Sequence, residues 1–120
     1  MAYSNIPLLT GGSLFQDTAN ANAAIAVKAS SGVLYAAELD NTAVAAASYF
    51  KLYNTSAGSV TVGTTVPDWV IMVPASTKIT MVLPSGVTFG TAISAATVTT
   101  GGTAGTTSPT GNFAVKLVYV

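Results

Sequence analysis

Apolar and polar side chains alternate along much of the chain, and this pattern predicts short β-strands. In "SYFKLYN", residues 48–54, Phe50 and Leu52 fall on one face and the residues around them fall on the other. Successive side chains of a strand point to opposite faces of a sheet, so we expect Phe50 and Leu52 in the core. The final "FAVKLVYV" alternates in the same way. One face carries Phe113, Val115, Leu117 and Tyr119, and the other carries Ala114, Lys116, Val118 and Val120.

Further alternating segments are separated by turn-forming residues. "AIAVK" and "VLYAAELD" flank the turn "SSG", and we predict that they form a hairpin. In the second of these segments, Glu38 falls on one face. The other face carries Val33, Tyr35, Ala37 and Leu39. "NTAVAAAS", residues 41–48, favours a loop or a short helical turn, because alanine favours helix while the flanking segments are typical of strands.

The second half of the chain continues the pattern. "TKITMVL", residues 77–83, places Ile79, Met81 and Leu83 inward, and "PSG" after it is expected to form a turn. "PDWVIMV", residues 67–73, is apolar on both faces, which predicts a strand that is covered on both sides. Trp69, Ile71 and Val73 share one face. Val70 and Met72 share the other and are candidates for an interface.

These segments together predict an all-β fold. About eight short strands at intervals of about 8–12 residues are typical of an antiparallel β-sandwich or jelly roll, which we assign to residues 21–120. Residues 1–20 show no clean periodicity and are expected to form an extended N-terminal arm. Its apolar pairs, Leu8 with Leu9 and Leu14 with Phe15, would lie either on a partner or on the same domain.

The charge content of the chain is very low. Four basic and four acidic residues make 7 % of the sequence, with a net charge of zero, against roughly 25 % charged residues in a typical soluble domain. A neutral protein has no electrostatic attraction to nucleic acid or to an anionic membrane, so neither is expected as a partner. No long apolar run or basic leader is visible, and we expect synthesis in the cytoplasm.

The sequence offers few groups for catalysis. With no histidine and no cysteine, Ser-His-Asp, Cys-His and imidazole or thiolate zinc sites are excluded. Glu38 and Asp40 lie close together in the sequence but are interpreted as a solvated strand end, and Ser76 with Lys78 as a turn serine and a surface lysine. We therefore expect no enzymatic activity, no cofactor and no metal.

Aromatic residues are the remaining contact candidates. Trp69 shares a face with Ile71 and Val73 and is interpreted as a core residue, the alternative being a platform for stacking on a sugar. Tyr49 and Tyr53 point outward in the predicted register. They are better interface candidates, because tyrosine brings apolar area and a hydroxyl to a contact.

The order of several motifs in residues 49–120 resembles a group of small structural proteins of tailed bacteriophages. The matching motifs are "YFKLYN", "TVGTTVP", "W-x-I-x-VP", "P-x-G-x-x-F" and a Thr/Gly-rich run before the closing strand. This chain has "VPAST" where the group has a "VPAG" turn, and "GGTAGTTSPTGN" replaces an Asp-rich loop. A cation site in that loop is therefore not carried over.

The resemblance implies a virion component on the capsid surface. The expected function is a capsid decoration or cement protein that binds the major capsid protein and stabilises the head, as a homotrimer. The alternative is a receptor-binding or carbohydrate-binding module of a tail fibre or tailspike, which would expose Trp69 or a tyrosine cluster in a groove.

Overall fold

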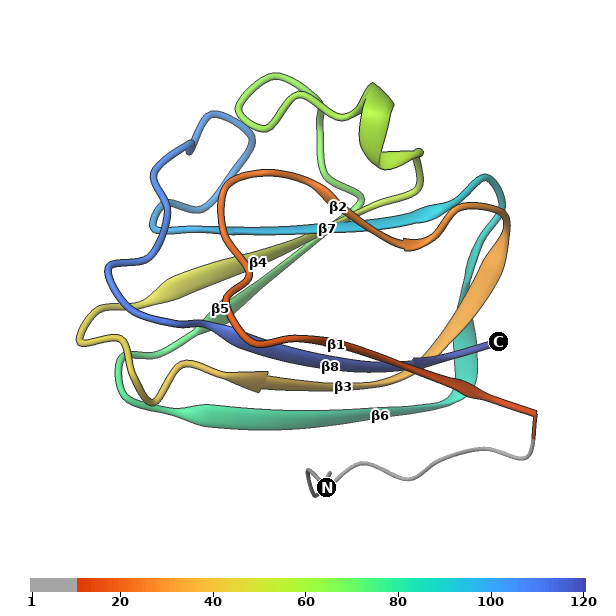
Figure 1. The fold of residues 1–120 in the computed structure, drawn as a ribbon, viewed down its shortest axis with the longest axis horizontal. Helices are drawn as coiled ribbons and strands as arrows, with labels where there is room; N and C mark the ends of the chain where they lie inside the picture. Colours follow the sequence, from red (N-terminus) through yellow and green to blue (C-terminus); the bar gives the residue numbers. More distant parts are fainter. Residues whose placement is uncertain (1–10) are drawn as a thin grey trace.

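The computed structural model describes residues 11–120, which form two four-stranded antiparallel sheets (Figure 1). Sheet A has the strand order β1-β8-β3-β6 and sheet B the order β2-β7-β4-β5. The one helical element is a short 3₁₀ turn, η1 (Ala57–Ser59), within the described residues. The strand bounds are β1 (Ser13–Asp17), β2 (Ile25–Lys28), β3 (Gly32–Asp40), β4 (Ser48–Tyr53), β5 (Trp69–Val73), β6 (Lys78–Phe89), β7 (Ile93–Val98) and β8 (Ala114–Tyr119).

This arrangement confirms the all-β prediction and is consistent with a β-sandwich. The strands pair in a nested order, β4 with β5, β3 with β6, β2 with β7 and β1 with β8. Two further ladders, β3 with β8 and β4 with β7, complete the sheets. The chain therefore changes sheet at every connection except the one from β4 to β5. The predicted hairpin of β2 and β3 is wrong, because these strands lie in different sheets.

The core lies between the inner faces of the two sheets. Phe50 and Leu52 are buried in it as predicted. Phe113, Val115 and Leu117, which the alternation places on one face, are buried in it too. Phe50 of β4 stacks on Phe113, the residue before β8, with ring centroids 6.2 Å apart and ring planes 15° apart. This aromatic contact joins sheet B to sheet A. Ile79 and Leu83 of β6 are partly buried against the same core, so their predicted inward direction is confirmed.

A bulge in β3 changes which of its residues enter the core. The register of β3 shifts between Leu34 and Ala36 on both of its neighbours. An extra residue in one strand reverses the side-chain alternation beyond it. Ala37 and Leu39 face inward, and Leu34 enters the core with them. The prediction that Val33 and Tyr35 share the face of Ala37 and Leu39 is therefore wrong.

The predicted turn "PSG" is also wrong, because β6 runs through it to Phe89. Opposite the bulge of β3, the ladder passes from Val82 to Val87, so residues 83–86 form an insertion in β6. Gly86 has φ +71°, and a Cβ there would lie 2.4 Å from Val33 Cγ1. The glycine thus allows the close approach of the two strands. Its positive φ, which was expected in a turn, occurs in a bulge of β6 instead.

The prediction of an arm over residues 1–20 is wrong for residues 13–17. These residues form β1, which pairs along its whole length with β8, because Phe15 can pack against the core while Leu14 lies on the outer face of sheet A. Leu8 and Leu9 lie outside the described residues. Leu14 packs against Val118 and Ala36, so Leu14 and Phe15 contact their own domain.

Two buried asparagines fix the connections between strands. Asn41 donates from its amide to the carbonyls of Ala46, Val73 and Pro74, and it accepts from the hydroxyl of Ser48. It therefore holds the end of β5 beside the start of β4. Asn20 accepts a hydrogen bond of 2.6 Å from the hydroxyl of Thr97 and so ties the connection after β1 to β7.

We predict that Phe113→Ala destabilises the protein by about 3–5 kcal/mol, the usual cost of truncating a buried phenylalanine. The measurement is chemical denaturation followed by tryptophan fluorescence. Phe113→Leu serves as the control, because it keeps most of the buried volume and is expected to cost less. A loss below about 1 kcal/mol for the alanine variant would contradict the assigned role of the stacked pair.

Candidate functional site

The outer face of sheet B brings together three of the predicted interface residues. Tyr49 of β4 lies directly opposite Met72 of β5, and Lys51 lies opposite Val70 in the same ladder. Side chains opposite one another in a ladder are about 4.5–5.5 Å apart at Cβ, so Tyr49, Met72 and Val70 form one contiguous surface. We call these three residues the β5 patch.

Two long connections cover the rest of this face. Residues 54–68, which lead into β5, and the first part of residues 99–113, which lead into β8, lie above sheet B (Figure 1). Lys51 donates to the carbonyls of Thr103 and Gly105 at 3.4 Å each. A Cβ on Gly101 would lie 3.0 Å from the ring of Tyr49, so that segment packs closely on β4. The covering stops before β5.

The β5 patch is consequently open to solvent. Val70 is 40 % exposed and Met72 is 50 % exposed, while Tyr49 is half-buried. Val66, in the connection before β5, is 71 % exposed. The prediction that β5 is covered on both sides is therefore wrong for its outer face. Val66, Val70 and Met72 are three of the five large apolar side chains that are exposed in the described part of the chain.

The inner face of β5 behaves as expected. Trp69 and Ile71 are partly buried against the core, and Val73 is buried in it. The interpretation of Trp69 as a core residue is confirmed. A platform for sugar stacking would require the indole to face solvent, whereas this register turns Trp69 toward the core and leaves it only partly exposed.

Tyr53 was expected to make an outward contact, and that prediction is wrong. Its side chain is on the outer face of β4 but is completely buried, because the covering connections lie over it. Its hydroxyl has no hydrogen-bond partner within residues 11–120. Burial raises the pKa of this hydroxyl above its ordinary value.

Lys51 is buried in the same place, which its sequence position did not suggest. Its side chain is completely inaccessible, and its amine makes two long hydrogen bonds to the backbone. Burial lowers the pKa of this amine, because removal from water disfavours the charged form. The sequence feature that could have indicated this burial is a lysine between Phe50 and Leu52 in an otherwise uncharged segment.

The carboxylate of Asp68, next to the β5 patch, already accepts a hydrogen bond within the protein. Asp68, directly before β5, accepts a hydrogen bond of 2.6 Å from the backbone N–H of Asn54. The side chain of Asn54 in turn accepts from the backbone N–H of Thr91. Asp68 therefore holds the connection in place, and β5 itself contains no charged residue.

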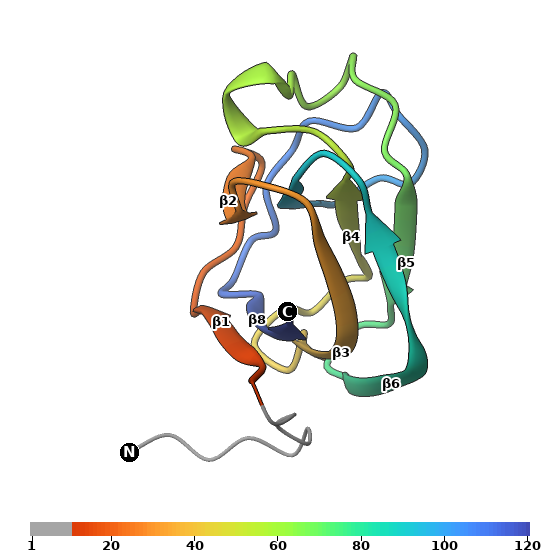
Figure 2. The ribbon, with the colours of Figure 1, turned by 90° about the vertical axis from the view of Figure 1, so that its right-hand side faces the viewer.

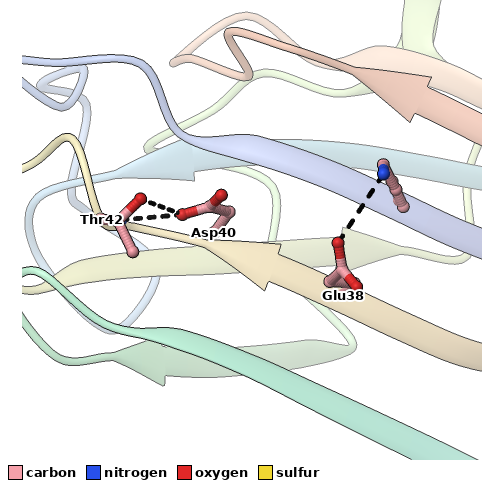
Figure 3. Close-up of polar contacts among 4 residues, drawn as sticks. Glu38, Asp40 and Thr42 are labelled. Atoms are coloured by element: carbon pink, nitrogen blue, oxygen red, sulfur yellow. Dashed lines mark hydrogen bonds and ion pairs between the residues drawn. The ribbon is translucent and has the colours of Figure 1, made fainter. Parts of the chain in front are cut away.

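Glu38 and Asp40 lie on the outer face of sheet A, where each has a different partner (Figure 3). Glu38 forms an ion pair of 3.9 Å with Lys116, its cross-strand neighbour. Asp40 accepts from the hydroxyl and the backbone N–H of Thr42, and the hydroxyl hydrogen bond holds the pKa of this carboxyl below its ordinary value. The two carboxylates therefore stabilise the end of β3 and the neighbouring turn.

Residues 11–120 contain no pocket, and no three His, Cys, Asp or Glu side chains gather there as they would around a metal ion. No helix in this part of the chain has the length and apolarity needed to cross a membrane. Ser76 has φ +53° and occupies the tight turn before β6, where its N–H donates to Val44.

Comparison with known proteins gives no further guide. A scan against protein-family models, a search of curated proteins and a search of solved structures each found no match.

We predict that Tyr53→Phe leaves the free energy of unfolding unchanged or raises it. Removing a buried hydroxyl that lacks a partner also removes its desolvation cost, whereas loss of a paired hydroxyl costs about 1 kcal/mol. Chemical denaturation measures the change. A destabilisation above about 1 kcal/mol would show that the hydroxyl is hydrogen-bonded in the native state.

We predict that Lys51→Met changes the dependence of stability on pH. The lowered pKa of Lys51 means that the unfolded chain binds more protons than the native state between that pKa and about 10.4. The wild type therefore gains stability relative to the variant as pH rises through this range, by at most about 1.4 kcal/mol per pH unit.

Denaturation of both proteins from neutral pH to about pH 10.4 measures this difference. Tyr53 and the other titratable groups are present in both proteins, so their contributions largely cancel. A constant difference between the two curves would contradict the assigned burial of the Lys51 amine.

Proposed function

We propose that the protein is a structural component of a bacteriophage virion, and specifically a capsid decoration or cement protein that binds the major capsid protein. The observation that carries this proposal is the exposed apolar β5 patch on a neutral molecule. Exposed apolar residues that cluster at one place favour a contact with another protein. The motif order in residues 49–120 supplies the phage context.

The topology supports a finer description of the fold as a jelly roll. The nested pairing of β1 with β8, β2 with β7, β3 with β6 and β4 with β5 is what results when one long hairpin is rolled into two sheets. Double-sheet jelly rolls occur in viral capsid and lectin domains. This shared architecture is an analogy, and it supports a virion role without identifying the contact.

The chemistry of the β5 patch fits a protein that binds by area. Burial of apolar surface contributes roughly 25 cal/mol per Å², and repeated weak contacts on a regular shell add through avidity. Val70 and Met72 offer such surface, and no charge on β5 has to be desolvated. Binding of this kind depends little on ionic strength, because screening acts on charged contacts.

The alternative, a carbohydrate-binding module of a tail fibre or tailspike, has less support. It requires an aromatic residue beside polar groups in a groove. Trp69 packs toward the core and Tyr53 is buried, which leaves Tyr49 as the one of the three aromatic candidates that is partly exposed on the outer face of sheet B. The homotrimer implied by the resemblance stays a prediction.

Cryo-electron microscopy of the purified virion tests the proposed function. Density for this chain on the capsid, with the β5 patch against the major capsid protein or a neighbouring copy, is the expected result. Add-back of the purified chain to heads that lack it should succeed for the wild type. Substitution Met72→Lys should weaken that binding, and Val82→Lys on sheet A is the matched control. Location at the tail tip or fibre would overturn the proposal.

A further inference from the structure

The four edge strands of the two sheets differ in how their open edges are protected. β1 and β6 are the edges of sheet A, and β2 and β5 are the edges of sheet B. An edge strand presents unpaired backbone N–H and C=O groups that can bind another strand. Proteins prevent this with charged residues, proline or irregular pairing at the edge.

Three of the edges carry such features. β1 ends at Asp17, and β2 ends at Lys28 after a shift in its register with β7. β6 begins with Lys78, contains Pro84 and is interrupted by the insertion at residues 83–86. Each of these edges therefore resists regular pairing with another molecule.

Between Asp68 and Pro74, the residues that flank it, β5 carries none of these features. Its five residues, Trp69–Val73, are all apolar, and its ladder with β4 is regular from end to end. Among the described residues it pairs only with β4, so its other edge has no partner strand. In Figure 2 it lies with β6 on the side of the molecule opposite β1 and β2. Asn41 fixes its carboxyl end through the carbonyls of Val73 and Pro74.

We propose that β5 pairs antiparallel with β5 of a second copy of this chain, which joins the two B sheets into one eight-stranded sheet. Self-pairing requires that residues brought together by a two-fold axis be compatible. An axis through Ile71 places Val70 opposite the partner's Met72 and Trp69 opposite the partner's Val73. Every such pair is apolar and none opposes like charges, so the strand is complementary to itself.

The same axis also explains where the exposed apolar side chains lie. Val70 and Met72 of both copies would form one continuous strip on the outer face, and Tyr49 would border it on each side. An isologous contact of this kind closes at two copies. A strand pair of five residues is small beside the roughly 800 Å² per partner of a standard interface, so the dimer dissociates on dilution.

Sedimentation equilibrium of the purified full chain, from micromolar to millimolar concentration, tests this pairing. The wild type is expected to pass from monomer to dimer. The double variant Val70→Lys with Met72→Lys, which brings like charges together across the axis, should raise the dissociation constant at least about tenfold. Val82→Lys, at a 53 % exposed residue of edge strand β6, is the matched control and should dimerise like the wild type. Circular dichroism checks that each variant is folded.

Cysteine cross-linking gives a second readout that does not depend on weakening the contact. The chain has no cysteine, so Val70→Cys with Met72→Cys introduces the sole thiols. Facing residues of the two copies should then form intermolecular disulfides under mild oxidation, and Val82→Cys should not.

A wild type that is monomeric at all concentrations overturns the proposal. A dimer or trimer whose mass is unchanged by the double lysine variant also overturns it. None of these results depends on a capsid, so failure here is distinguishable from failure of the proposed function.

Discussion

Burial of the two inner sheet faces against each other is the constraint on which the rest of the structure depends. Phe50 and Phe113 meet in the middle of this core, one from each side. Because the chain crosses between the sheets at almost every connection, the ladders pair strands that are distant in sequence. Two open sheets also leave four edges, and the protection of each edge determines where the molecule can meet another chain.

Because the chain has few charged residues, uncharged polar side chains make many of the contacts that hold its connections. The connections are anchored by the amides of Asn41 and Asn20, each bonded to several groups. Lys51 supports the segment at residues 103–105 by bonds to its carbonyls. The few charged side chains anchor connections or lie on other strands. β5 is therefore an entirely apolar edge, and the exposed β5 patch is a consequence of the low charge content of the whole chain.

The sequence predicted features that depend on local periodicity. The core positions of Phe50 and Leu52 and the shared face of Val115 and Leu117 in β8 were assigned correctly, because a strand alternates wherever it pairs. The partners of β2, the inclusion of β1 in sheet A and the bulge at residues 34–36 were missed, because pairing and register depend on distant segments. In the candidate site, Tyr49, Val70 and Met72 were identified, but the burial of Tyr53 depends on connections whose path has no periodic signal.

We propose that this protein meets another chain through the open edge of β5. Amide hydrogen exchange of the purified protein, measured at low and at high concentration, tests this proposal. Protection of residues 69–73 is expected to increase with concentration, while the protection of edge strand β6 stays constant. Protection of β5 that is the same at every concentration would contradict the proposal.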